Sequence, residues 1–494
     1  MIPITPISGG LLLLYWLRWL LRKRKDLPLV VPILFTCLFL PKLNLIEISV
    51  QSTAGIRIDD LLALALLIIA VTDRETWKNR IIRRGVVFLL ILSVLNLGSL
   101  VSGRLQGYSN NVLFSILTVI RKFEYFSFAL TGIWIVRRLK DPYRTFMDEF
   151  TLMSAFHAIL AVLQILGKTT YVVSGADGGW FFGGAAVSTF NGYYEYGQFL
   201  CFGCVIFMCD YLKRKNILSL VMLPVTLGML LKTGSRTSLV AGALLILWII
   251  WFPVRGKISR PRLILGSWSA IGALAAVTVL AAGMIAWETA GRFATLDLGE
   301  TVYWKELLLR GDFGGYLANL VRGIEAYGGA EQFGFLEKIS DLSAASRLYK
   351  WGAALDGFRH SPVLGYGPGL AATIDGNYLK MLGETGLAGT IAWFAYYGYF
   401  MRAAAKVRRK TALGRPLLLM MVSVLMNALL IDMFEASKPM EMIWLLVGAV
   451  LYAAYGVSVS GEKILRRDVL KDGAGLYSER REESDQTDQR LQEV

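Results

Sequence analysis

The sequence predicts an all-α polytopic membrane protein with about 12–13 transmembrane helices and one large helical loop on the extracytoplasmic side. Three observations lead to this prediction. Of the 494 residues, 55% are hydrophobic and 18% are charged, whereas about a quarter of the residues in soluble domains are charged. Long apolar segments recur along most of the chain, and basic clusters follow alternate segments. The mean hydropathy of +0.51 is typical of this class.

A helix that crosses about 30 Å of hydrocarbon needs roughly 20 mostly apolar residues. Segments of this kind are expected at 5–21, 27–44, 56–72, 85–102, 112–136, 147–166, 195–212, 216–232, 237–254, 263–286, 387–403, 415–432 and 440–457. The first segment is the least regular, because Arg18 lies near its end. It lacks a small-residue cleavage site followed by a soluble domain, so we do not interpret it as a removed signal peptide.

The net charge of +15 is distributed in a pattern that predicts topology. Six basic clusters fall on one side of the membrane if the N-terminus is outside and the C-terminus is inside, as the positive-inside rule requires. The clusters are Arg22 to Lys25, Arg74 to Arg84, Arg137 to Arg144, Lys213 to Lys215, Arg255 to Arg262 and Arg402 to Arg415. This distribution accounts for the charge without a nucleic-acid partner.

Residues 1–460 are predicted to form one integral membrane domain whose large external loop is 288–386, and residues 461–494 a disordered cytoplasmic tail. The sequence has neither a Walker A motif nor a Gly-x-Gly-x-x-Gly motif after a strand, which argues against ATP-driven transport and cytosolic nucleotide-sugar use. All four cysteines lie in apolar segments, and His157 and His360 are the two histidines. We therefore expect neither a metal nor a cofactor.

The interval from Ser346 to Gly389 is where we expect the chemistry, because it lies in the one long hydrophilic interval of a chain that is otherwise expected to be buried in the membrane. Charged and aromatic side chains lie there among glycine turns: Arg347, Arg359, His360, Tyr366, Asp375, Tyr378 and Glu384. Apolar residues at steps of three or four over 348–358 predict an amphipathic helix above the mouth of a cavity. Arg347 begins this helix, and a surface arginine stacked on Trp351 is the alternative interpretation.

Arg236 lies in an abrupt polar break between two apolar segments, at the expected start of the ninth helix on the external face. A helix N-terminus with an adjacent guanidinium is a potential anion site. The alternative is an interfacial arginine that extends to the membrane surface. Arg236 and Arg347, if they converge, would clamp a pyrophosphate without a metal and stabilise it as a leaving group.

Several acids have two possible roles. Asp375 precedes an expected helix start, where it is either an N-cap or a general base that deprotonates an acceptor hydroxyl. Glu384 has the same ambiguity, with a turn acid as the alternative. Arg57, Asp59 and Asp60 lie at the entrance of the third segment, where charges are ordinary. Paired acids there are a weaker prediction of a metal or base site.

Two groups lie near or inside the membrane. Glu195 and Tyr196 begin the seventh segment among aromatic residues that either bind sugars or form an interfacial belt. Arg121, Lys122 and Glu124 form the only charge cluster expected inside the membrane, where ionisable residues are candidates for function because their burial is costly unless they are paired. Arg121 and Glu124 have the i, i+3 spacing that would let them neutralise each other.

Three short motifs occur in a characteristic order. The first motif is Gly234-Ser235-Arg236-Thr237, which follows an apolar segment. The second is Ser346-Arg347, which precedes Trp351 and Ala354. The third begins with Pro362 to Gly367 and continues with Tyr378-Leu379, Glu384, Gly386 and Gly389. Together with the single large external loop, these motifs resemble the bacterial O-antigen ligase and O-antigen polymerase superfamily over roughly residues 190–460. The resemblance implies an all-helical fold of the membrane glycosyltransferase C type and a reaction that needs no metal.

The sequence departs from the ligase pattern at Asp375-Gly376, where similar ligases carry His-Asn. An acid at this position resembles the polymerase branch. By resemblance, Arg236 and Arg347 would hold the lipid pyrophosphate, and Asp375 would orient or deprotonate the acceptor sugar. The substrate-binding residues expected beside them are Glu195, Tyr196, Arg359, Tyr366, Tyr378 and Glu384.

The topology and the resemblance predict the same substrate. Nucleotide-activated sugars are not available outside the membrane, so a transferase there must use a glycan already attached to a carrier lipid. We therefore expect a polysaccharide polymerase of the bacterial plasma membrane that transfers a growing glycan from undecaprenyl diphosphate to another lipid-linked repeat unit. A chain-length regulator is a candidate partner. The alternatives are a ligase that uses another acceptor and a lipid-linked oligosaccharide flippase.

Overall fold

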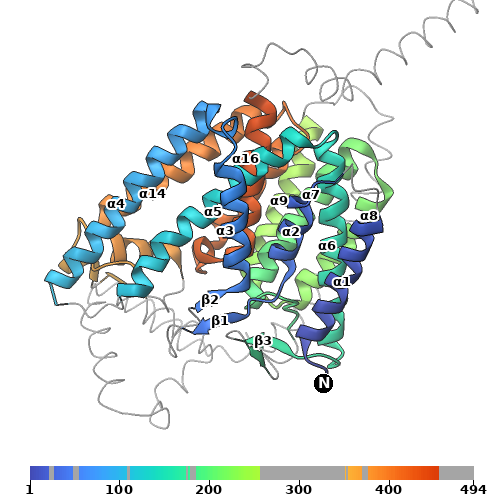
Figure 1. Ribbon diagram of the computed structural model, residues 1–494, viewed down its shortest axis with the longest axis horizontal. Coiled ribbons are helices and arrows are strands. Elements are labelled where there is room, and N and C mark those ends of the chain that lie inside the picture. The colour runs from blue at the N-terminus through green and yellow to red at the C-terminus, as the bar shows by residue number, and fades with distance from the viewer. Residues whose placement is uncertain are drawn as a thin grey trace, which may run out of the picture.

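The computed structural model describes residues 1–21, 27–47, 55–107, 112–173, 176–178, 185–255, 351, 354–355, 357–369 and 376–455. In these parts the protein is mostly helical, as the composition predicts, and its helices form one bundle (Figure 1). The expected segment 263–286, most of the expected external loop 288–386 and the tail 461–494 lie outside the described residues.

Each of the other twelve expected segments coincides with a described helix. These helices are α1 (Ile4–Leu21), α2 (Val30–Phe39), α3 (Ile58–Val71), α4 (Arg80–Leu105), α5 (Val112–Arg138), α6 (Pro142–Ile165), α7 (Tyr193–Arg214), α8 (Ile217–Lys232), α9 (Arg236–Arg255), α14 (Asn377–Val407), α15 (Gly414–Asn427) and α16 (Ser437–Tyr455). Short 3₁₀ turns, η1 (Thr76–Lys78) and η4 (Met433–Glu435), precede α4 and α16.

The helix starts follow local capping chemistry. The Asn79 side chain accepts a hydrogen bond from the Ile81 amide at 2.9 Å and begins α4. Asp141 does the same for Arg144 at 2.9 Å, with Pro142 in the first turn of α6. Asn and Asp satisfy free amides at a helix start, and proline is tolerated there because it has no amide hydrogen to lose.

Two short β-hairpins add structure that the sequence did not predict. β1 (Asn44–Glu47) pairs antiparallel with β2 (Gly55–Arg57), and β3 (Tyr171–Val173) pairs antiparallel with β4 (Ala176–Gly178). Both lie at the end of the bundle where α1 begins (Figure 1). A bridge between Ile2 and Thr169 joins the N-terminus to the same end.

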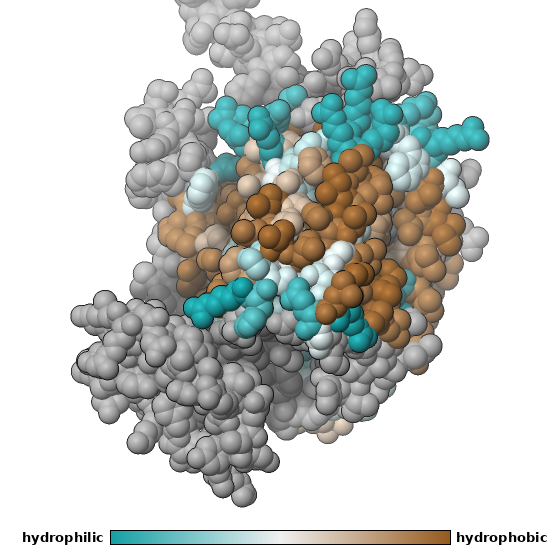
Figure 2. Space-filling view, turned by 90° about the vertical axis from the view of Figure 1, so that its left-hand side faces the viewer, coloured by the Kyte–Doolittle hydropathy of each residue, from teal (hydrophilic) through white to brown (hydrophobic). Residues whose placement is uncertain are grey.

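The outer surface carries an apolar band. Figure 2 shows hydrophobic side chains between two groups of hydrophilic ones. By length and composition, three described helices could cross a membrane, namely α1, α4 and α6. α2 has 10 residues and α15 has 14, shorter than the roughly 20 that a perpendicular span requires. The coarse prediction of a membrane protein is therefore supported.

Small residues bring α5 and α16 into close contact. A side chain at Gly132 would overlap the Leu445 backbone, and one at Gly448 would overlap the Ala129 backbone. Close backbone approach at small residues is characteristic of helix pairs inside membranes, where little hydrophobic force drives association. α4 and α14 form a second long pair that tilts together away from α16 (Figure 1).

The loop between α3 and η1 is tied to the last turn of α5. Arg137 and Arg138 both donate hydrogen bonds to Asp73, the second at 3.4 Å. Burial by itself would raise the pKa of Asp73, but the two guanidinium groups hold that pKa below its ordinary value. Part of this basic cluster is therefore neutralised within the protein.

Candidate functional site

A cavity of about 370 Å³ lies between α3, α4, α5, α14 and α16. Its walls are mainly apolar and aromatic, with a few convergent polar groups, as is typical of ligand sites. The polar and charged residues that line it are Asp60, Asn96, Thr118, Arg121, Lys122, Glu124, Ser127, Asn377, Lys380, Glu384, Thr385 and Glu435.

Two neighbouring cations of α5 line one wall. Lys122 donates to the backbone oxygen of Thr118 at 3.2 Å. Among the described residues, no carboxylate lies within 4.0 Å of the charged nitrogens of Arg121 or Lys122. The expected neutralising contact between Arg121 and Glu124 is therefore not formed. One carboxylate oxygen of Glu124 is also buried without a hydrogen bond in this part of the chain.

Lys380 occupies the opposite side on the first turns of α14, and it is fully engaged. Its ammonium group contacts Asp432 at 2.6 Å and Glu435 at 2.9 Å. Asn377 donates to Asp432 and accepts from the Phe434 amide at 2.9 Å. These contacts hold η4 against the start of α14, with Glu435 at the cavity.

Glu384 lines the cavity beside a kink in α14. Its carboxylate accepts a hydrogen bond from the Gly369 amide at 3.0 Å. Its backbone oxygen accepts from the Ser99 hydroxyl and from the Gly367 amide, the latter at 2.9 Å. Two residues later Gly386 has φ 59° and ψ −165°, which interrupts the helix. The expected boundary at 386–387 is thus a kink, and α14 begins at Asn377.

Tyr366 and Tyr378 make internal contacts. Tyr366 is buried with its ring against Gly357, and its amide donates to the Gly383 oxygen at 3.1 Å. The Tyr378 hydroxyl donates to the Leu425 oxygen at 2.7 Å, and its ring stacks on Phe394. Neither tyrosine lines the cavity. Both hold the surrounding elements together.

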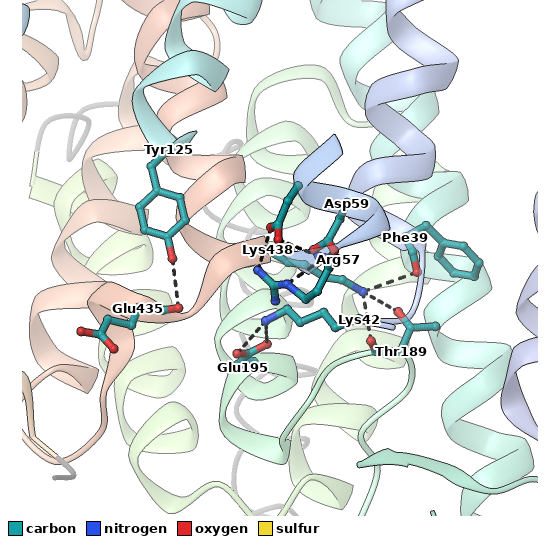
Figure 3. Close-up of polar contacts among 10 residues, drawn as sticks. Phe39, Lys42, Arg57, Asp59, Tyr125, Thr189, Glu195, Glu435 and Lys438 are labelled. Carbon is teal, nitrogen blue, oxygen red and sulfur yellow. Dashed lines mark hydrogen bonds and ion pairs between the residues drawn. The ribbon is translucent and has the colours of Figure 1, made fainter. Parts of the chain in front are cut away.

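A second polar cluster lies at β2 and the starts of α3, α7 and α16 (Figure 3). Glu195 forms an ion pair with buried Lys42 at 2.8 Å. Lys438 donates to the Thr189 hydroxyl at 2.8 Å and points toward the Phe39 oxygen (Figure 3). Tyr196, one residue after Glu195, is fully buried against Phe190. The ring that was expected to stack on sugars therefore belongs to the core.

Arg57 and its two acids belong to the same polar cluster. Arg57 contacts Asp60 at 3.1 Å and Asp59 at 3.6 Å, so these charges are paired at the start of α3. On α16, both carboxylate oxygens of Glu441 are buried without a hydrogen bond among the described residues. Arg121 to Glu124 is therefore not the only charge cluster inside the bundle.

The structure describes two of the three arginines that were expected at the site, Arg236 and Arg359. Arg236 is exposed at the first residue of α9, after a turn in which Gly234 has φ 69°. Arg359 is exposed in the helical segment 357–360. Neither lines the cavity. Arg347 and Asp375 lie outside the described residues. Of the residues expected to be catalytic or substrate-binding that the structure describes, only Glu384 lines the cavity.

The sequence did not predict that Lys380, Asp432 and Glu435 contact one another. The signal was present: Asp432 ends an expected apolar segment, and ionisable residues at such depth need partners. The sequence did not show which partner each one has, because 52 residues separate Lys380 from Asp432. No grouping of His, Cys, Asp and Glu suited to a metal ion occurs in the described ranges.

The sequence was also compared with known proteins. No family model matches the chain, and no curated protein matches it either.

Proposed function

We propose that the protein is a membrane glycosyltransferase that polymerises a polysaccharide. The reaction would transfer a growing glycan from undecaprenyl diphosphate to a hydroxyl of another lipid-linked repeat unit on the outer face of a bacterial plasma membrane. Arg236 and Arg347 would bind the diphosphate, and Asp375 would orient or deprotonate the acceptor. We further propose about 12–13 membrane spans in a glycosyltransferase C-like fold.

The observation that carries the proposal is the cavity. It lies beside the N-terminal part of α14, close to where the expected external loop ends. The cavity combines an apolar and aromatic wall with Arg121 and Lys122, and Glu384 of the third motif lines it. A lipid-linked diphosphate sugar has the same combination of an apolar chain, an anionic head and a polar glycan. The turn at 365–369 is fastened to α5 where the Ser115 hydroxyl donates to the Pro368 oxygen. The third motif is thereby connected to the cavity.

The test is reconstitution. The purified full-length protein in lipid nanodiscs is incubated with a polyprenyl-diphosphate-linked repeat unit, and the products are separated by size. A ladder of products that increase by one repeat supports a polymerase. Transfer of preformed long chains to a different acceptor, with no ladder, identifies the ligase alternative. Neither product, together with movement of the lipid-linked unit between leaflets, would refute the transferase proposal.

The flippase alternative has one specific observation in its favour. Charged side chains are buried inside the protein, including Lys42, Arg57 and Glu441. Interior charges of this kind are common along transport pathways. Most of them are paired or hydrogen-bonded, as Lys42 is with Glu195. We therefore keep transport as the second candidate, which the leaflet measurement distinguishes from transfer.

A further inference from the structure

The cavity has a cationic wall whose charges have no anionic partner among the described residues. Arg121 and Lys122 are consecutive on α5, and both line the cavity. The third lining cation, Lys380, is already neutralised by Asp432 and Glu435. Burying an unpaired cation costs several kcal/mol, so a cavity with two of them is suited to an anion.

The carboxylates that line the cavity do not neutralise Arg121 and Lys122. Glu384 accepts a hydrogen bond from the Gly369 amide, and Asp60 is paired with Arg57 at 3.1 Å. Glu435 is engaged by Lys380 at 2.9 Å. Glu124 lies three residues after Arg121 on α5, beyond ion-pair distance within the described part of the chain. The two α5 cations are the groups left for a ligand.

The cavity also reaches the apolar outer surface of the bundle. Leu61 and Leu64 of α3 and Ile120 of α5 line it, and each of these side chains is 52% exposed. Ile120 immediately precedes Arg121, so the exposed apolar edge continues directly into the cationic wall. Arg121 is roughly 14 Å along the helix from Val112, within the depth of the apolar band. A ligand here therefore needs both an anionic head and an apolar chain.

We propose that Arg121 and Lys122 bind the diphosphate of a polyprenyl lipid, whose first isoprene units leave the cavity past Leu61, Leu64 and Ile120. This inference rests on the proposed function for the identity of the lipid and adds a site apart from Arg236 and Arg347. Arg121 presents a planar guanidinium for paired phosphate contacts, and Lys122 supplies a second charge. The shared chemistry is a phosphate anion, and its source is either a lipid headgroup or a free anion.

The experiment measures binding to the full-length protein in detergent by calorimetry, with no glycan or acceptor present. The probes are farnesyl diphosphate, inorganic pyrophosphate and farnesol. We expect farnesyl diphosphate to bind at least tenfold more tightly than either of the other two. Arg121→Gln and Lys122→Gln should each weaken that binding roughly tenfold or more, because each removes a charge-assisted hydrogen bond. Arg84→Gln is the matched control, an exposed arginine of α4 outside the cavity.

The apolar exit has its own pair of variants. Leu64→Trp adds bulk at the exposed edge of the cavity and should weaken farnesyl diphosphate binding severalfold. Ile68→Trp adds the same bulk one turn further along α3, where the side chain is 58% exposed and does not line the cavity. It should leave binding unchanged. Arg121→Lys retains the charge but loses the paired contacts of the guanidinium, so it should weaken farnesyl diphosphate binding severalfold and carries the test if Arg121→Gln does not fold.

Two outcomes overturn the proposal. Unchanged farnesyl diphosphate affinity in both glutamine variants would remove Arg121 and Lys122 from the site. Equal affinity for pyrophosphate and farnesyl diphosphate, with no effect of Leu64→Trp, would make the cavity a site for a free anion. Because no glycan is transferred in this assay, its result is independent of the reconstitution. A chain that binds the lipid here but makes no polymer fails as a polymerase and retains this site.

Discussion

Lys380 is buried between two carboxylates at the start of α14, and replacing it would leave both acids without their cation. Lys380→Met should lower the free energy of unfolding by about 3 kcal/mol, the scale seen when one partner of a buried ion pair is removed. Denaturant or thermal unfolding in detergent measures this. Adding Asp432→Asn should restore part of the loss, and the exposed Lys168→Met should be nearly neutral. Equal stability of Lys380→Met and the parent would contradict the buried triad.

Arg236 and Arg347 are proposed to bind the departing diphosphate. Arg236→Ala and Arg347→Ala should each abolish polymer while protein levels stay normal, because alanine removes a charge needed to stabilise the leaving group. Polymer length on gels and immunoblots of the membrane fraction check both effects. Lys232→Ala is the control, an exposed cation four residues before Arg236. Normal chain lengths in either arginine variant would refute the clamp.

The N-cap of α14 is Gly376, so the general-base interpretation of Asp375 is the one left to test. Asp375→Asn should abolish transfer if the carboxylate deprotonates the acceptor, because an amide cannot take the proton. Residue 375 precedes the N-cap Gly376, so the substitution removes no helix cap and stability should hardly change. The reconstituted assay and a thermal melt measure the two quantities separately. Activity that survives this substitution would refute the general-base role of Asp375.

At the scale of the element, the kink of α14 depends on one glycine. Gly386 has φ 59° and ψ −165°, a backbone conformation that is essentially restricted to glycine. A side chain there would also overlap the Val363 backbone. Gly386→Ala should therefore cost about 2 kcal/mol or more and reduce transfer, since the kink positions Glu384. Thermal unfolding and the product ladder measure these effects.

The same helix supplies the control. Gly398 lies in the regular part of α14, where a side chain would meet no atom within 4 Å. Gly398→Ala should be neutral or slightly stabilising, because alanine has the higher helix propensity. If both alanine variants were equally stable, the kink at Gly386 would not be a constraint on the fold.

For the whole molecule, the basic clusters predict which end of the bundle faces the cytoplasm. In a Cys209→Ser background, an introduced Lys168→Cys should react with a membrane-impermeant thiol reagent in intact cells. Arg74→Cys should react only after permeabilisation. Both positions are exposed, whereas Cys37, Cys201 and Cys204 are buried and should stay unlabelled. Labelling of Arg74→Cys in intact cells would invert the proposed topology.

The sequence by itself determined where the helices lie. Twelve apolar segments coincide with α1 to α9 and α14 to α16, because helix formation in such segments depends on local apolar composition and on caps such as Asn79 and Asp141. The largest boundary error was at α2, which was expected over 27–44 and is observed over Val30–Phe39. At α14, the helix start expected after Asp375 and the segment expected from 387 are both present, and they meet at the kink at Gly386.

Only the tertiary structure decided which charges meet. Lys42 pairs with Glu195 across 153 residues, and Lys438 reaches Thr189 across 249. No local pattern encodes such pairs, because each joins segments that are distant in the sequence and that only the packing of the helices brings together. The same packing separates Arg121 from the described carboxylates and places it at the cavity. The segment expected to hold the chemistry contributes Glu384 and the paired Lys380 there. The two cations without a described carboxylate partner come from the middle of α5, where the sequence favoured self-neutralisation.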